Sequence, residues 1–293
     1  MAQRENNTLF IPGLLTALKA EWFSNTRLRG ARLLIALPSL AVILRLLVLK
    51  ITTANQAARG TLLSDQSVET LSNGYGYWVD GLSTGLILLY LLMIGWSAYS
   101  FAFERDHGIA RHLTIRRLSR SAIIVAKFIS ANVLALFAVL LLLLVTTLLA
   151  QILWNFGAVV EDGYEIIGVA DIQHEIRQGL TLALLPLPTC IALGLLFSVS
   201  AQSATQAVTL ALGMALLLDL FKGVIGNAAH FIYASFQPSL LDQSYLHDVA
   251  RIVRGYSDVL IDERTYLFNL WLPLPQAVLF VILALVIVRK RTL

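Results

Sequence analysis

Six long apolar runs dominate the 293-residue sequence. A helix needs roughly 20 mainly apolar residues to cross a hydrocarbon core of about 30 Å, and each run is of that order. The core of the third run starts at Val133, but a helical apolar pattern extends it back to Ser121. The sequence therefore predicts an all-α integral membrane protein with a single transmembrane domain and six spans, at approximately 33–51, 82–103, 121–153, 180–200, 207–225 and 270–288.

The composition excludes the main soluble classes of protein. Hydrophobic residues make up 57% of the chain and charged residues only 14%, against roughly 45–50% and about 25% in soluble domains. So few charges cannot wet the surface of a soluble fold of this length. A soluble enzyme, a disordered chain and a nucleic-acid binder are thus excluded, and no nucleic-acid partner is expected despite the sequence pI of 9.3.

The basic residues indicate how the chain is oriented. With the N-terminus inside, the cytosolic segments hold 14 of the 22 basic residues and the three outer loops hold five. Of the 18 acidic residues, 13 fall outside. Because Lys and Arg accumulate on the cytosolic side of membrane proteins, both termini are predicted to be cytosolic, in the cell inner (plasma) membrane.

The segment before the first span, residues 1–32, is predicted to contain an amphipathic helix. Leu15, Leu18 and Trp22 lie at helical spacing, with basic residues nearby that can reach anionic head groups. An ordinary cytosolic helix is the alternative. Acidic and amide residues stand where a signal peptide has its basic and apolar regions, so no cleaved leader is expected.

Two outer segments also have interpretable patterns. The first outer loop, 52–80, ends with Tyr75, Tyr77 and Trp78, which suit the aromatic belt at a membrane interface; a ligand-stacking site is the alternative. The outer segment 226–269 is too long for a simple connection, so short re-entrant or interfacial helices are expected there.

The inner connection Glu104–Lys127 carries six basic residues directly against the membrane. Gly108 can end the second span, so that Ile109–Leu118 forms a short helix across its end, with Ser119 or Ser121 capping the helix that follows. A solvated loop whose only role is to orient the chain is the alternative.

Catalytic and metal-binding motifs are missing from the sequence. The five histidines form no HExxH pattern, no glycine-rich loop precedes a lysine, and no GxSxG motif occurs. Cys190 is the single cysteine, so the chain can form no internal disulfide. We therefore expect no metal site and no enzyme activity in this chain by itself.

Charged residues inside spans are candidates for function, because each is costly at the bilayer centre. Arg45 and Lys50 lie toward the outer end of the first span and are expected to extend to the interface, with a substrate contact as the alternative. Asp219 and Lys222 share one face of the fifth span at i and i+3 and are expected to neutralise each other. A proton or ion relay is the alternative for that pair.

The inner connection resembles the type-2 family of ABC transporter permeases, which often have the pattern E-[RK]-[ED]-x-G-T-x-x-x-L-x-x-x-P-[ILV]-S-R after the second span, followed by a helix that starts near a lysine. Ile109 replaces the usual Thr, and Arg117 replaces the usual Pro. The segments LKAEWFSNTRLRG and LGLLFSVSAQSATQAV are more loosely similar to the family's connecting helix and to its short inner turn between spans four and five. The matching residues are Glu104, Arg105, Asp106, Gly108, Leu113, Leu118, Ser119, Arg120 and Lys127.

The resemblance implies a permease dimer, with an identical or related second chain, on two copies of a cytosolic ABC ATPase subunit that carries the ATP and Mg²⁺. The loop 104–120 would then hold a coupling helix that rests in a groove of the ATPase. The implied ATPase-coupling residues are Glu104, Arg105 and Gly108, the apolar anchors Ile109, Leu113 and Leu118, and the cations Arg111, Arg116 and Arg117. The turn 201–206 would be a secondary contact.

Three functions follow as hypotheses. The first is an ATP-driven exporter permease for a lipid, glycan, peptide or hydrophobic drug. The second is a mechanotransmitter, which relays ATPase motion to an outer-face accessory protein without moving solute through its centre; the acidic outer segments offer such a partner a binding surface. The third, a membrane-embedded enzyme, lacks paired catalytic groups.

Overall fold

The computed structural model describes residues 13–63, 73–109, 118–161, 164–222 and 263–290, together with parts of 224–253. The chain is mostly helical. Six helical stretches are long and apolar enough to cross a membrane, which confirms the number of predicted spans and fits a multi-pass membrane protein. They are Arg29–Asn55, Gly74–Asp106, Arg120–Leu153, Val169–Ser200, Ala204–Phe221 and Leu267–Lys290.

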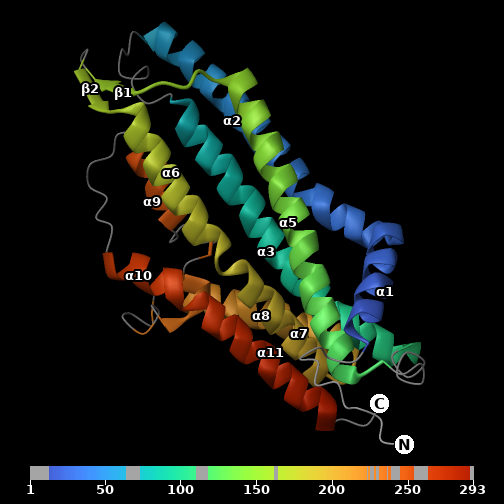
Figure 1. Ribbon diagram of the computed structural model, residues 1–293. Coiled ribbons are helices and arrows are strands. Elements are labelled where there is room, and N and C mark those ends of the chain that lie inside the picture. The colour runs from blue at the N-terminus through green and yellow to red at the C-terminus, as the bar shows by residue number, and fades with distance from the viewer. Residues whose placement is uncertain are drawn as a thin grey trace, which may run out of the picture.

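Helix α3 (Gly74–Asp106) lies at the centre of the bundle (Figure 1). It packs against α2 (Arg29–Leu63) and α5 (Arg120–Leu153) on one side, and against α7 (Leu187–Ser200) and α8 (Ala204–Phe221) on another. Helix α11 (Pro273–Lys290) covers α7. Consequently α3 and α7 supply much of the core, and α2, α8 and α11 keep broad apolar faces exposed on the single chain.

The three longest helices exceed the predicted spans. Helices α2, α3 and α5 have 35, 33 and 34 residues, or about 50 Å each at 1.5 Å per residue. The predicted spans 33–51 and 82–103 therefore lie inside longer helices, which continue through less apolar sequence at both ends. The third span, predicted from Ser121, begins at Arg120, while the fifth and sixth end near their predicted limits.

The start of α3 places Tyr75, Tyr77 and Trp78 in a helix and not in the predicted loop 52–80. Asn73 caps α3, its side chain accepting from the Tyr75 N–H at 3.2 Å, so the aromatic residues lie within the helix. The Tyr77 ring stacks on Trp154 with centroids 4.4 Å apart, and Trp78 Nε1 donates to Thr147 Oγ1 at 3.1 Å. These side chains fasten α3 to the end of α5.

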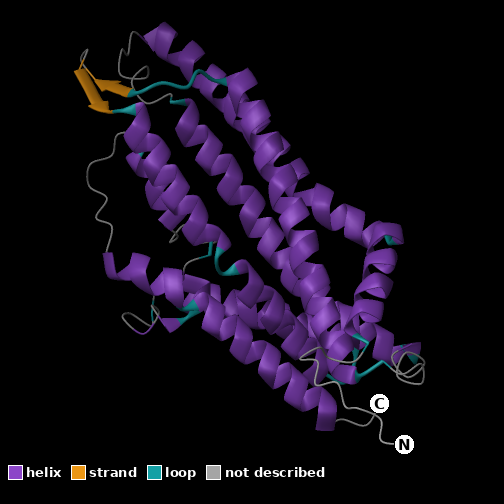
Figure 2. Cartoon of the chain, in the orientation of Figure 1, coloured by secondary structure: helices purple, strands orange, loops and turns teal. Residues whose placement is uncertain are grey.

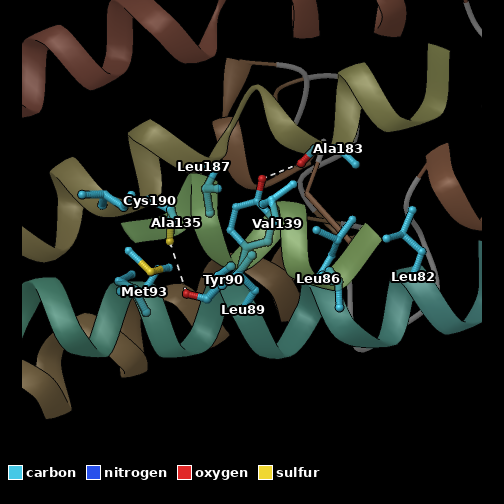
Figure 3. Close-up of a cluster of buried hydrophobic side chains, with 14 of the residues drawn as sticks. Leu82, Leu86, Leu89, Tyr90, Met93, Ala135, Val139, Ala183, Leu187 and Cys190 are labelled. Atoms are coloured by element: carbon cyan, nitrogen blue, oxygen red, sulfur yellow. Dashed lines mark hydrogen bonds between the residues drawn. The ribbon is translucent and has the colours of Figure 1, made fainter. Parts of the chain in front are cut away.

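The fourth predicted span, 180–200, is not one straight helix. Helix α6 (Val169–Leu184) ends before Pro186, and α7 starts at Leu187. Proline has no N–H to donate to the carbonyl four residues earlier, so the chain bends there. The Leu182 carbonyl instead accepts from Asn269 Nδ2 at 3.0 Å, and the Ala183 carbonyl accepts from the Tyr90 hydroxyl at 2.5 Å (Figure 3).

The all-α prediction also misses a small β-hairpin. Strands β1 (Val159–Glu161) and β2 (Tyr164–Ile167) pair antiparallel, with Val160 opposite Glu165, beside the first turn of α6 (Figure 2). An Asp-Gly dipeptide at 162–163 separates the strands in the sequence, which is a strong hairpin signal. Apolar and polar residues do not alternate cleanly on either side of this dipeptide, so the sequence pattern does not predict strands there.

The outer segment 226–269 contains short helices where the structure describes it. These are the 3-10 turn Tyr233–Ser235, α9 (Tyr245–Ile252) and α10 (Glu263–Trp271). Helix α9 packs on α3 and α6, and α10 contacts α6 and α11. The segment therefore packs against the bundle in several places.

Before the first span, α1 (Leu14–Arg27) is a separate helix that ends earlier than the predicted limit at 32. Leu28 adopts an extended conformation, with ψ 124°, and α2 starts at the next residue. After this elbow, α1 packs mainly against α5, not against the neighbouring α2 (Figure 1).

Candidate functional site

The candidate site lies where the end of α3 meets α1, the start of α5 and the start of α8. Glu104, Arg105, Gly108, Ile109 and Leu118 are described here. The other predicted coupling residues, Arg111, Leu113, Arg116 and Arg117, lie outside the described residues, as does most of the predicted coupling helix.

Lys127 ties three helices together at this site. From α5, its Nζ contacts Glu21 Oε1 of α1 at 2.7 Å and Glu104 Oε1 of α3 at 2.6 Å. The lysine side chain is 3% exposed, and the two carboxylates are 14% and 20% exposed. The cluster of Glu21, Lys127 and Glu104 therefore holds two acids against one base, largely out of water.

Such a cluster fixes geometry more than it adds stability. Removing ions from water costs several kcal/mol each, and the mutual attraction repays this only with good geometry and complete hydrogen bonding. Here Glu104 Oε2 is buried with no hydrogen-bond partner among the described residues. The cluster fixes the positions of α1, α3 and α5 relative to one another, since one short contact joins α5 to α1 and the other joins α5 to α3.

Asp106, the last residue of α3, binds the start of α8. Its Oδ2 accepts from the Ala204 N–H at 2.6 Å. The first turn of α8 is also capped by Ser203, whose hydroxyl accepts from the Gln206 N–H at 3.2 Å. A carboxylate at a helix N-terminus satisfies a free N–H and interacts favourably with the helix dipole. Asp106 thus links the end of α3 to the turn before α8, the two segments for which the resemblance implied contacts with an ATPase.

Between these two acids, Arg105 Nη2 contacts Asp106 Oδ1 at 3.4 Å. Arg105 Nη1 is buried and has no hydrogen-bond partner among the described residues. The three consecutive residues Glu104, Arg105 and Asp106 therefore form a polar junction at the end of α3. We call these residues the α3 terminal triplet.

Backbone geometry separates the α3 terminal triplet from the following loop. Gly108 has φ +72°, a left-handed conformation that favours glycine and ends a helix, as the sequence predicted. Ile109 beyond it is 42% exposed. On the far side of the loop, Ser119 caps α5 by accepting from the Ala122 N–H at 3.1 Å, which resolves the choice between Ser119 and Ser121.

The loop is also anchored next to a second, smaller core. Leu118 packs against a cluster that joins α3, α5, α7 and α11, consisting of Phe101, Ile123, Ile124, Val199, Ala284 and Val288. Arg289 Nε of α11 donates to Ser121 Oγ at 3.2 Å. The start of α5 therefore contacts the end of the last helix as well as α1 and α3.

The predicted intramembrane charges have different surroundings. Arg45 is exposed on α2. Lys50 Nζ donates to the Leu153 carbonyl at 2.6 Å, at the end of α5, and lies over the Trp154 ring. Asp219 and Lys222 are both buried and form an ion pair at 2.9 Å, the pairing that their spacing predicts. None of these charges lies in the cluster of Glu21, Lys127 and Glu104.

Sequence reasoning missed three features of the site. The sequence predicts no contact between Lys127 and Glu21, no contact between Lys127 and Glu104, and no capping role for Asp106. A signal existed for Lys127, because it is the single charge in an otherwise apolar stretch from Ala122 to Asn132. Its two partners come from distant parts of the chain and have no such signal.

Within the described ranges, no group of three or more His, Cys, Asp or Glu side chains is arranged to hold a metal ion. Comparison with known proteins gives no further guide, since no family model, no curated protein and no solved structure matches the chain.

Proposed function

We propose that this chain is the permease subunit of an ATP-driven transporter of the type-2 ABC exporter kind. It would work as a dimer with two copies of a separate ATPase subunit, which holds ATP and Mg²⁺. The observation that carries the proposal is the α3 terminal triplet, in which Glu104 binds Lys127 of α5 and Asp106 binds the start of α8. A force on the loop after Asp106 would therefore act on α3, α5 and α8 together.

The packing supports transmission of such a push through the bundle. Helix α3 contacts α7, and α7 contacts α11, so a tilt of α3 displaces both sides of the core. Close-packed interfaces shift between discrete arrangements and do not deform continuously. In this proposal, nucleotide-driven closure of the ATPases moves the loop 104–120 and rocks the two permease chains between inward-closed and outward-open states.

The proposal includes an orientation. Both termini, α1 and the α3 terminal triplet would face the cytosol, in the cell inner (plasma) membrane, because most Lys and Arg residues cluster at that end. The outer hairpin, α6 and α9 would then lie on the opposite side. Hydrolysis takes place on the partner, so this chain is not itself an enzyme in the proposal.

Charge reversal in the loop tests the proposal. The double variant Arg116→Glu, Arg117→Glu should lose the ABC ATPase that co-purifies with the wild-type chain, or lose stimulation of its ATP hydrolysis, because both cations would pair with acids on the ATPase. The matched control is Lys290→Glu with Arg291→Glu, a double reversal at the C-terminus. If no ABC ATPase co-purifies with the wild type, or if both double variants bind and stimulate it normally, the proposal is wrong.

The β-hairpin favours one alternative, in which the dimer relays motion to an outer-face protein and passes no solute through its centre. Val160, Tyr164 and Ile166 are 50%, 80% and 51% exposed on its two strands, so the hairpin offers several apolar side chains to a partner. A dimer structure separates the two functions. A continuous, solute-sized path through the dimer supports export. A sealed apolar interface between the two chains, with a partner protein bound to the hairpin, supports the relay.

A further inference from the structure

Two adjoining hollows open beside the elbow between α1 and α2. The smaller, of about 130 Å³, is lined by residues of α1, α2 and α5, among them Trp22, Arg32, Leu134 and Phe137. The larger, of about 480 Å³, lies between α1 and α5. Trp22, Thr26 and Ser130 line both, so the two hollows form one surface feature, which we call the elbow hollow.

The inner part of the elbow hollow is apolar and aromatic. The rings of Trp22 and Phe137 lie with centroids 6.1 Å apart, and each of these side chains is 48% exposed. Leu134 and Ile35 lie beside them, and Ile129 and Val133 line the larger part. An open apolar surface of this kind, at the base of a membrane-spanning helix, suits an acyl chain.

The rim of the elbow hollow is polar and hydrogen-bonded. Asn25 Nδ2 donates to Ser130 Oγ at 2.6 Å, which joins α1 to α5 across the hollow. The Arg32 guanidinium makes one long hydrogen bond, to the Arg27 carbonyl at 3.5 Å. Within the described part of the chain, its other N–H groups have no protein acceptor and remain available to an anion.

The charge around the elbow hollow is strongly positive. Residues 13–35 contain four bases, at positions 19, 27, 29 and 32, and one acid, Glu21. Glu21 is already paired with Lys127. Basic pockets between membrane helices bind anionic lipid head groups, and tryptophan favours the same depth of the bilayer.

We propose that the elbow hollow binds one anionic phospholipid, with its phosphate at Arg32 and an acyl chain against Trp22, Leu134 and Phe137. The proposal rests on α2 and α5 spanning a bilayer and does not depend on coupling to an ATPase. A lipid seated there contacts α1, α2 and α5 together, so it holds α1 in its docked position from the membrane side.

Retention of lipid by the purified chain tests this proposal. The detergent-purified protein is mixed with equal amounts of dioleoyl phosphatidylglycerol and dioleoyl phosphatidylcholine, and the lipid retained on each chain is counted by native mass spectrometry. We expect one phosphatidylglycerol per chain in preference to phosphatidylcholine. Arg32→Gln should weaken that retention roughly tenfold, because a charge-assisted hydrogen bond is lost.

Two further variants locate the effect. Arg45→Gln removes another exposed arginine of α2, 13 residues or about 20 Å further along the helix, and should retain phosphatidylglycerol like the wild type. Thr26→Trp places a large ring at an exposed position that lines both parts of the elbow hollow, and should exclude the lipid without disturbing the core. A monodisperse elution profile and an unchanged Tm verify folding.

Four outcomes overturn the proposal. The first two are equal retention of the two lipids by the wild type, and an equal loss of phosphatidylglycerol in Arg32→Gln and Arg45→Gln. The third is undiminished phosphatidylglycerol retention in Thr26→Trp, and the fourth is displacement of phosphatidylglycerol by millimolar inorganic phosphate. The last result would indicate a site for a soluble anion and not for a lipid. The ATPase of the proposed transporter is absent from this measurement, so failure here leaves the proposed function untouched.

Discussion

Lys127 is held between carboxylates from two other helices, and within the described ranges neither carboxylate pairs with a second base. Removing the lysine would leave two like charges side by side, largely shielded from water. The same residue that fixes α1 against α3 is therefore the one whose loss is most costly.

We expect Lys127→Met to destabilise the chain by about 3 kcal/mol, the low end for a buried ion that loses its partner, because both glutamates keep some contact with solvent. For a chain of this length this corresponds to a fall in Tm of roughly 5 °C. Lys19→Met, at an exposed site on α1, should change Tm little. Adding Glu21→Gln and Glu104→Gln should restore most of the loss, and a triple variant as unstable as the single one would contradict this electrostatic explanation.

Tyr90 gives a second expectation at the level of a single atom. Tyr90→Phe removes the hydroxyl that donates to the Ala183 carbonyl and leaves that carbonyl buried without its donor. A cost of about 1–3 kcal/mol follows, measurable as a lower Tm. Tyr99→Phe, on the same helix but 39% exposed, is the matched control. Equal behaviour of the two variants would show that the Ala183 contact is unimportant.

The residue contacts that the sequence predicted are the local ones. The i, i+3 spacing of Asp219 and Lys222 and the position of Ser119 before an apolar helix carry their own geometry. The pairing of Lys127 with Glu21 depends on how α1 folds back after Leu28, and no local pattern encodes that path. The contact between Asp106 and Ala204 likewise joins helices that are nearly a hundred residues apart, so no local pattern encodes it either.

Among the elements, α3 and α7 approach closely at Gly194. A β-carbon placed there would lie 2.7 Å from the Ile94 carbonyl oxygen and 2.8 Å from Ser97 Cβ. Ser198, one turn further, accepts from the Ala102 N–H of α3 at 2.9 Å. The absence of a side chain at position 194 therefore sets the distance between these helices.

Gly194→Ala should push α3 and α7 apart and cost about 1–3 kcal/mol through overpacking. The control is Gly213→Ala on α8, where a β-carbon meets nothing within 4 Å of the described structure and alanine gains up to about 1 kcal/mol in helix propensity. The two variants should therefore shift Tm in opposite directions. A stabilised Gly194→Ala protein would be inconsistent with the close contact.

The number of spanning elements was predictable, but their lengths and bends were only partly so. Apolar runs mark the hydrocarbon core and fade where α2 and α3 continue into water or against other helices. The predicted span 180–200 runs through Pro186, where α6 and α7 bend, and the hydrogen bonds from Asn269 and Tyr90 at that bend depend on the positions of α10 and α3. The hairpin was missed because its strands have only three and four residues.

At the scale of the whole molecule, helices of unequal length share one bundle. Helices α2, α3 and α5 are about 50 Å long, whereas the 18 residues of α8 or α11 measure about 27 Å. The long helices therefore extend past α8 and α11, on the side of the hairpin and α6 (Figure 1).

Cysteine labelling tests this layering and the proposed orientation together. Cys190 is buried and is the single cysteine, so the background is low. Gln151→Cys, exposed near the end of α5, should react with a membrane-impermeant maleimide in intact cells. Leu136→Cys, also exposed but about 22 Å lower on the helix, should react only after denaturation. Labelling of Gln151→Cys only in inside-out vesicles would show that the proposed orientation is wrong.

The docking of α1 on α5 also has a consequence for biosynthesis. Asn25 and Ser130, which join these helices, are 105 residues apart in the chain. At about 5–20 residues per second, the ribosome needs roughly 5–20 s to make that stretch. During this interval α1 has no α5 to pack against, and its exposed Leu15, Trp22 and Phe23 need another apolar surface. The bilayer surface is the nearest one, so we expect the N-terminal helix to lie first on the lipid and to move onto the protein once the third span has been inserted.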